Sequence, residues 1–184
     1  MPRFPPVALT TERLTLRFIE ENDAAAHFAI FSDPAVMRYW SSAAWTDMAQ
    51  ADAAVQKTLN AYADSSSLCL GIVLRATGEL VGTITLYAID NHSRRCGIGY
   101  ALAQAHWGKG YLSEAVPAML NHGFGELNLN RVEADIDPRN TASEKLLQRM
   151  GFQKEGYMPE RWIVNDEICD TVFYGLLRSQ WEKR

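Results

Sequence analysis

Residues 105–115 read AHWGKGYLSEA, in which two glycines flank a lysine directly before an apolar stretch with helical spacing. Apolar side chains then recur three and four positions apart, at Leu112, Ala115, Val116, Met119, Leu120 and Phe124. This spacing predicts a helix over 112–124 with one buried face. Pro117 lies inside it and predicts a local kink, because proline removes one helical hydrogen bond.

The start of this helix is predicted to bind an anion. The first backbone N–H groups of a helix have no intrahelical acceptor, and glycine lets the backbone come close to a ligand. We therefore expect the N–H groups of residues 108–112 to converge on a phosphate, and a pyrophosphate is the natural ligand. Lys109 would add positive charge if its side chain points the same way.

The turn at 108–110 has other interpretations. A P-loop is excluded in its standard form because the pattern GxxxxGK[ST] is absent. A dinucleotide fold places an acidic residue about 20 positions after its glycines, where Glu133 lies, but Ser113 replaces the third glycine and the preceding strands form an antiparallel meander. A helix-entry turn without a ligand remains the simplest interpretation of these residues alone.

Composition and charge narrow the class of protein. The chain has 184 residues, of which 47% are hydrophobic and 22% charged, and these values are typical of one folded domain, expected over 1–184. The net charge of −4 and the pI near 5.6 argue against binding to a phosphate backbone. We expect no nucleic-acid partner.

Cysteine and histidine spacing predicts neither a disulfide framework nor a metal site. Three cysteines lie far apart without a CxxC pair, and four histidines share no ligand spacing. No stretch reaches the ~18 apolar residues of a membrane span, and the first residues lack the apolar core of a signal peptide. We expect no membrane partner and a cytoplasmic location.

Hydrophobic periodicity predicts the order β α α β β β α β α β β, a mixed α/β (α+β) sheet with flanking helices. The expected strands span 14–18, 68–76, 79–88, 96–103, 131–136, 152–163 and 168–177, with hairpin turns at 76–78 and at Asn165-Asp166. Besides 112–124, the expected helices are 24–31 with Asn22-Asp23 as its cap, one from Thr46 or Asp47 to about 63, and 142–150, which starts with a Thr141/Glu144 capping box and ends at Gly151.

The stretch WGKGYLSEA at 107–115 resembles the acyl-CoA pyrophosphate loop of the GNAT acetyltransferase superfamily, in the W-G-K-G-Y-x-x-E-A form of its RimJ/RimL-like branch. The rest of the chain is similar to that branch in the same order: TERLTLR at 11–17, SDPAVMRYW at 32–40, GELVGTITL at 78–86, IGYAL at 98–102, NRVEADIDPRNTASEKLLQRMGFQKEG at 130–156 and D-x-x-x-Y-x-L-L at 170–177. The resemblance covers nearly the whole chain.

The resemblance implies the GNAT fold, a central mixed and mostly antiparallel sheet that splays between its fourth and fifth strands. It also implies transfer of an acetyl group from acetyl-CoA to a primary amine by direct attack in a ternary complex, without a metal. Backbone N–H groups would hold the pyrophosphate, the pantetheine would run along the fourth strand like an extra strand, and an N–H of that strand would stabilise the oxyanion. The implied acetyl-CoA-binding residues are Ile98, Tyr100, Leu102, Trp107, Gly108, Lys109, Gly110, Tyr111, Leu112, Asn140 and Ser143.

The catalytic residues are less explicit. Many members of the superfamily carry a glutamate on the fourth strand as general base, but SRRCGIGYALA at 93–103 contains no acid. Glu133 and Asp135 share one face of the fifth strand, so either could act through a water, although a solvated strand face would look the same. The resemblance makes Ser143 a candidate proton donor to the thiolate, with Tyr157 as an alternative. The late aspartate of the family matches Asp170, which could equally be structural.

Two further assignments stay open. Asn140 could contact the pantetheine or merely cap the helix that follows it. The aromatic residues Tyr39, Trp40 and Trp45 lie where the family builds its acceptor pocket, but aromatic clusters are more often part of the core.

The acceptor itself could be a protein N-terminus, notably of a ribosomal protein, or a small amine such as a polyamine, amino acid or antibiotic. A non-catalytic acyl-CoA sensor is a further alternative, and a monomer or homodimer is expected.

Overall fold

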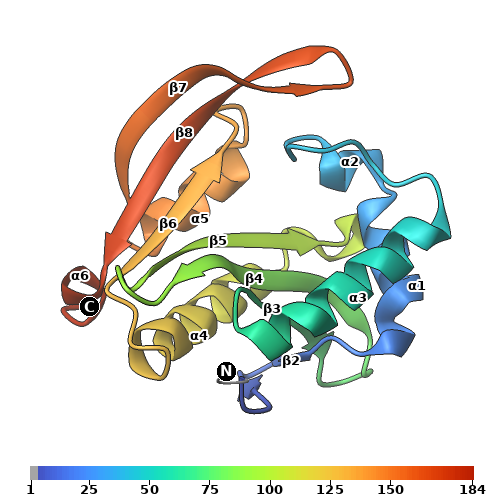
Figure 1. The fold of residues 1–184 in the computed structure, drawn as a ribbon, viewed down its shortest axis with the longest axis horizontal. Helices are drawn as coiled ribbons and strands as arrows, with labels where there is room; N and C mark the ends of the chain where they lie inside the picture. Colours follow the sequence, from blue (N-terminus) through green and yellow to red (C-terminus); the bar gives the residue numbers. More distant parts are fainter. Residues whose placement is uncertain (1–3) are drawn as a thin grey trace.

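The computed structural model describes residues 4–184, whose central feature is one eight-stranded sheet with the order β1-β2-β3-β4-β5-β6-β8-β7 (Figure 1). Neighbouring strands pair antiparallel, except that β5 and β6 are parallel. The strands are β1 Ala8–Thr10, β2 Leu14–Phe18, β3 Leu68–Leu74, β4 Leu80–Asp90, β5 Arg95–Leu102, β6 Arg131–Ile136, β7 Gln153–Val164 and β8 Glu167–Leu177. The predicted fold class is confirmed; residues 1–3 of the expected domain lie outside the described residues.

Helices cover both faces of the sheet. They are α1 Ala24–Phe31, α2 Pro34–Met37, α3 Met48–Asp64, α4 Tyr111–Gly125, α5 Thr141–Arg149 and α6 Arg178–Trp181, with 3₁₀ turns at Glu21–Asp23 and Gln104–His106. Alternation along β3 shows how the faces are divided. Leu70 packs in the main core with Met119 of α4, whereas Cys69, on the opposite face, packs against Val55 of α3.

Three short elements were not predicted from the sequence. β1 has only three residues and is held by pairing with β2, so it shows no alternation of its own. α2 has four residues, begins at Pro34 and is capped by Asp33, which accepts the N–H of Ala35 at 2.8 Å. α6 ends the chain directly after β8. Elements of three or four residues are too short to show a hydrophobic period.

The caps of α1 and α5 are only partly as predicted. Asp23 occupies the N-cap position of α1, as expected, but its side chain makes no capping hydrogen bond there and instead accepts hydrogen bonds from the Arg17 guanidinium and, at 2.8 Å, from the N–H of Glu20. The expected Thr141 cap of α5 was wrong: Asn140 caps this helix, one of the two roles left open for it, because its Oδ1 accepts the N–H of Ser143 at 3.2 Å. At α1 the half-buried Arg17 binds the carboxylate of Asp23, and at α5 the side chain one position before Thr141 makes the cap.

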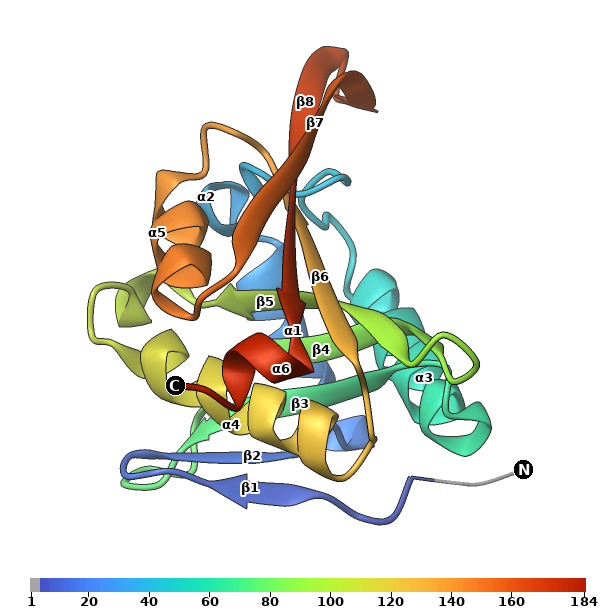
Figure 2. The same ribbon diagram turned by 90° about the vertical axis from the view of Figure 1, so that its left-hand side faces the viewer.

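β5 and β6 separate along their length, which creates the gap in the sheet. Their pairing covers only Arg95–Arg131, Cys96–Val132 and Gly97–Glu133. Beyond Gly97, β5 pairs only with β4 and β6 only with β8, and Figure 2 shows β6 and β8 rising away from β5. The predicted splay is confirmed. It leaves backbone N–H and C=O groups of both strands facing the gap, where an extended ligand can bind as an extra strand.

Candidate functional site

The turn before α4 has the backbone conformation that its two glycines permit. Gly108 has φ of 73° and Gly110, the residue that precedes α4, has φ of 80°, so both lie in the left-handed region that other residues rarely adopt. Trp107 fixes the turn to the end of β5, since its indole N–H donates to the carbonyl of Leu102 at 2.7 Å. The N–H groups at the start of α4 therefore face one common space.

The loop between β1 and β2 clamps the first turn of α4. Glu114 accepts hydrogen bonds from the Thr11 hydroxyl at 2.7 Å, from the N–H of Arg13 at 3.1 Å and from the Arg13 guanidinium. The same guanidinium donates to the carbonyl of Lys109 at 2.9 Å and lies 4.7 Å from the centre of the Tyr111 ring. This clamp could not be predicted from the sequence because its two halves lie about 100 residues apart.

A cavity of about 910 Å³ extends from the splayed part of β5 to the N-terminus of α4. Of the predicted acetyl-CoA-binding residues, it is lined by Tyr100, Leu102, Trp107, Gly108, Gly110, Tyr111, Leu112, Asn140 and Ser143. Lys109 does not line this cavity, and Ile98 is buried in the core and lines the neighbouring one. A helix N-terminus at one end suits a pyrophosphate and unpaired strand edges at the other suit amides, so the cavity fits acetyl-CoA.

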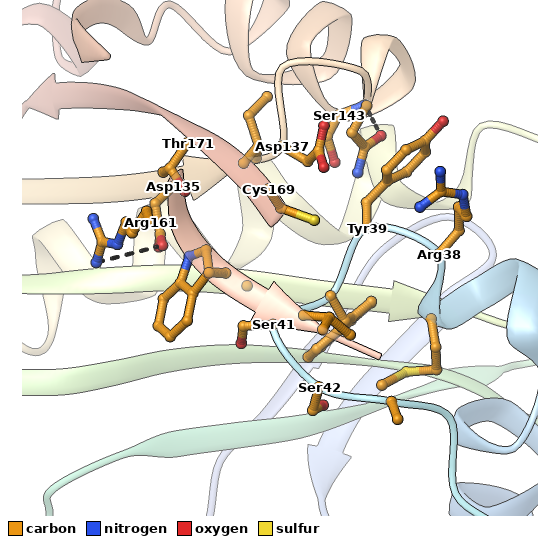
Figure 3. Close-up of a pocket in the computed structure, with 18 of the residues that line it drawn as sticks. Arg38, Tyr39, Ser41, Ser42, Asp135, Asp137, Ser143, Arg161, Cys169 and Thr171 are labelled. Atoms are coloured by element: carbon orange, nitrogen blue, oxygen red, sulfur yellow. Dashed lines mark hydrogen bonds and ion pairs between the residues drawn. The ribbon is translucent and has the colours of Figure 1, made fainter. Parts of the chain in front are cut away.

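A second cavity of about 770 Å³ lies between α2, the splayed strands and the start of β8 (Figure 3). Both cavities are lined by five residues: Tyr39, Trp40, Tyr100, Asn140 and Ser143. Tyr39 and Trp40 come from the segment after α2, Tyr100 from β5, and the other two from the start of α5. The two cavities therefore meet where the splay opens, so a molecule in each would be in contact there.

Only one of the two acids predicted on the fifth strand lines a cavity. Asp135 lines the second cavity, accepts a hydrogen bond from the Tyr87 hydroxyl at 2.7 Å and lies 3.9 Å from the Arg161 guanidinium (Figure 3). Glu133 lies where β5 and β6 still pair, and it is bound by Arg131 at 2.7 Å and Arg95 at 3.3 Å outside both cavities. Glu133 and Asp135 share one face of β6, but the β5–β6 pairing ends between them, so only Asp135 faces a cavity.

Tyr87 and Gly97 were missed and explain the position of Asp135. A Cβ on Gly97 would lie 2.3 Å from the Tyr87 ring, so glycine lets this ring lie across β5. The Tyr87 hydroxyl then reaches Asp135 on the next strand, past the last paired residues. A glycine after a cysteine in a strand pattern was the only sequence signal of this close contact.

Tyr157 is not brought to either cavity. It is 54% exposed on β7, and its hydroxyl donates to Asp170, which does line the second cavity. The hydrogen bond from Tyr157, together with the N–H of Glu160, holds the pKa of Asp170 below its usual value. Tyr157 is thus placed to orient an aspartate rather than to meet a departing thiolate.

The aromatic cluster divides between core and cavity. Trp45 lines neither cavity and packs against Phe31 with ring centres 4.9 Å apart. Trp40 contacts the same ring edge-on at 5.3 Å but also lines both cavities. Tyr39 is 38% exposed and lines both as well.

An ion network joins three separate segments beside the second cavity. Arg38 donates to Glu167 at 3.2 and 3.3 Å, and Arg139 donates to Glu167 and, at 2.9 Å, to Asp137. The Arg38 and Arg139 guanidiniums lie 5.3 and 5.9 Å from the centre of the Tyr39 ring. The hydrogen bond from Arg139 lowers the pKa of Asp137. This network was missed because its members are separated by up to 129 positions.

Cys96 lies beside the site as an inert thiol. It is 1% exposed, and burial raises its pKa to about 12, so it stays protonated at neutral pH. Within residues 4–184 no group of three His, Cys, Asp or Glu side chains is arranged to hold a metal ion. No helix in that range is long and apolar enough to cross a membrane.

Comparison with known proteins identifies the family. Residues 13–153 match the family model of the acetyltransferase (GNAT) domain. The chain is 38% identical over 173 residues to a Bacillus licheniformis protein named uncharacterized N-acetyltransferase p20, covering 94% of this chain and 97% of that protein. It is 26% identical over 186 residues to the ribosomal protein uS5-alanine N-acetyltransferase of Escherichia coli strain K12, covering 96% and 94%.

A solved structure shows the same fold. The GNAT-family acetyltransferase from Bacillus anthracis aligns with a TM-score of 0.83 and 28% identity over 94% of this chain and 99% of that one. These similarities confirm the predicted resemblance along almost the whole chain. The chain therefore belongs to the GNAT family and is an acyl-CoA-dependent N-acetyltransferase.

Proposed function

We propose that the protein transfers an acetyl group from acetyl-CoA to a primary amine by direct attack in a ternary complex. The observation that carries this proposal is the meeting of two cavities at Tyr100, Asn140 and Ser143. Direct attack needs both reactants at one point, in contact and oriented, and two joined cavities meet that requirement. The buried, protonated Cys96 favours direct attack over an acyl-enzyme on this thiol.

The residues of the larger cavity would bind acetyl-CoA, which supplies the acetyl thioester. The N–H groups of residues 108–112 bind the pyrophosphate, aided by the positive end of the α4 dipole. The free edge of β5 beyond Gly97 binds the pantetheine amides. A β5 N–H directed into the gap donates to the thioester oxygen and stabilises the negative charge that develops on it.

Asp135 is the proposed acceptor-side base, acting through a water molecule. It lines the acceptor cavity, and Tyr87 and Arg161 hold it there. An amine that enters as an ammonium must lose a proton before it can attack, and a carboxylate can accept that proton through one water. Ser143, on the α5 side of the junction, is the proposed donor to the departing sulfur.

A protein N-terminus is the acceptor that we propose first. The support is the 26% identity, over 96% of the chain, to an enzyme named for the alanine of ribosomal protein uS5. The second cavity is lined by four carboxylates, of Asp135, Asp137, Glu167 and Asp170, and by two arginines, Arg38 and Arg161. Arg38 and Arg161 are paired with Glu167 and Asp135, so the excess of carboxylates suits a cationic amine of either kind, and the choice of a peptide rests on the similarity to that enzyme.

An acceptor panel tests this proposal. The protein is incubated with acetyl-CoA and each of several peptides with alanine or serine N-termini, spermidine, free amino acids and an aminoglycoside, and products are identified by mass. We expect acetylation of a peptide α-amine. Asp135→Asn should lower kcat roughly 100-fold if Asp135 is the base, whereas Asp52→Asn, an exposed aspartate on α3, should change nothing. Acetylation of spermidine alone would overturn the peptide assignment.

A further inference from the structure

The Tyr100 hydroxyl is a buried polar group that the proposed chemistry has not yet used. Tyr100 lines both cavities at their junction, and its hydroxyl is buried without a hydrogen-bond partner among the described residues. Buried hydroxyls are normally hydrogen-bonded, because an unpaired one loses its bonds to water without replacement. An unpaired hydroxyl at a reaction junction therefore indicates a group that meets its partner only when the site is filled.

The fold places this hydroxyl opposite Ser143. Along β5, Tyr100 shares a face with Ile98 and Leu102, which are 3% and 6% exposed in the core, but it lies beyond the last pairing with β6. Ser143 is on the first turn of α5, where the Asn140 cap holds its backbone N–H. Tyr100 and Ser143 both line the two cavities, so their side chains meet at the junction, and burial there raises the pKa of Tyr100 to about 12.

Serine alone is a poor proton donor to a thiolate. A thiol has a pKa of about 8.5, and a serine hydroxyl is a far weaker acid than a tyrosine, whose unperturbed pKa is about 10. Even at about 12, Tyr100 is much closer to the thiol than Ser143 is. Proton transfer is efficient only when donor and acceptor are not far apart in pKa. A serine at this position therefore needs a stronger acid behind it.

We propose that Tyr100 supplies the proton that Ser143 passes to the departing CoA sulfur. Ser143 gives its hydroxyl proton to sulfur while the carbon–sulfur bond breaks and sulfur keeps the electron pair. Tyr100 gives its own proton to the Ser143 oxygen in the same step and becomes a phenolate, which is reprotonated from solvent, where the proton lost by the amine balances the one that is taken up. The proton lost by the amine leaves separately through Asp135. This relay rests on the proposed function, and Tyr100 acts in it through Ser143.

The pKa of the bound CoA thiol reports the relay without turnover. Ultraviolet absorbance measures the thiolate as pH rises, and the complex with desulfo-CoA, which has no thiol, corrects for tyrosine ionisation. The relay donates to the thiolate and so lowers the pKa of the bound thiol. We expect Tyr100→Phe to raise that pKa by about one unit, a tenfold loss of thiolate. Tyr62→Phe is the matched control, because Tyr62 is a buried tyrosine on α3 that lines neither cavity.

A double variant tests whether the two hydroxyls act in series. Ser143→Ala alone should raise the thiol pKa, and adding Tyr100→Phe to it should raise it no further. The same non-additivity is expected in kcat, with Tyr100→Phe about 100-fold below wild type and affinity for desulfo-CoA unchanged. Independent, multiplying effects would overturn the relay, as would an unchanged thiol pKa in Tyr100→Phe. Failure of the wild type to bind CoA and desulfo-CoA would instead reject the acetyl-CoA cavity itself.

Discussion

Among single residues, Gly108 is the position where backbone conformation and proposed ligand meet. Its φ of 73° lies in the left-handed region, and a Cβ built there meets no atom within 4 Å. A side chain at 108 would therefore project into space that the proposed pyrophosphate needs. Gly78, in the hairpin turn between β3 and β4, has φ of 76° and equally open surroundings. The two glycines carry the same backbone strain but differ in their distance from the cavity.

Gly108→Ala and Gly78→Ala form a matched pair. Each should lower the free energy of unfolding by about 1 kcal/mol, because alanine rarely adopts the left-handed conformation. Only Gly108→Ala should also weaken acetyl-CoA binding, by roughly tenfold or more, since about 1.4 kcal/mol corresponds to a factor of ten. Calorimetric titration with acetyl-CoA measures the affinity of both variants. Equal affinities in the two variants would remove the turn from the binding site.

Among the elements, α5 begins at a residue with two possible roles. Asn140 caps the helix through Oδ1, and it also lines both cavities, so its amide nitrogen can contact a ligand. Asn140→Ala should lose about 1 kcal/mol of stability and also weaken acetyl-CoA binding. Asn140→Ser keeps a capping hydroxyl but removes the amide nitrogen. Asn140→Ser should have the melting temperature of the wild type but bind acetyl-CoA weakly. Wild-type affinity in Asn140→Ser would show that Asn140 only caps the helix.

The local elements were predictable because their signals are local. The alternation of Leu14, Leu16 and Phe18 predicted β2, and the helical spacing after residue 111 predicted α4. Features that depend on partners distant in the sequence could not be predicted. They are the Arg13–Glu114 clamp, the Arg38–Glu167 ion pair and the position of Glu133 where β5 and β6 still pair. A period of two puts Glu133 and Asp135 on one face, but only the end of β5–β6 pairing separates their surroundings.

Across the whole molecule, the buried His27 and the half-buried His122 make stability depend on pH. His27 is 4% exposed, and the Nε2 of His122 is buried without a partner among the described residues. Burial lowers the pKa of both below the usual value. Below pH of about 6.5 the unfolded chain thus binds more protons than the folded one, and the free energy of unfolding falls as pH falls.

We therefore expect the melting temperature to drop between pH 7 and pH 5, with a smaller drop in His122→Gln. His92→Gln, which changes an exposed histidine, should melt with the wild-type slope. Thermal unfolding followed by circular dichroism at several pH values checks this. A melting temperature that does not change between pH 7 and pH 5 would show that burial does not lower the pKa of either His27 or His122.

The arrangement of the whole molecule makes one kinetic claim. Two cavities that meet at Tyr100, Asn140 and Ser143 can hold donor and acceptor at once, and Cys96 is a buried, protonated thiol that lines neither of them. The direct measurement is the initial rate of CoA thiol release, with acetyl-CoA and the best amine of the panel varied together. Double-reciprocal lines that intersect are expected, because direct attack requires a ternary complex. Parallel lines would indicate an acyl-enzyme, and acetyl-CoA binding without amine-dependent release would indicate a sensor; either would contradict it.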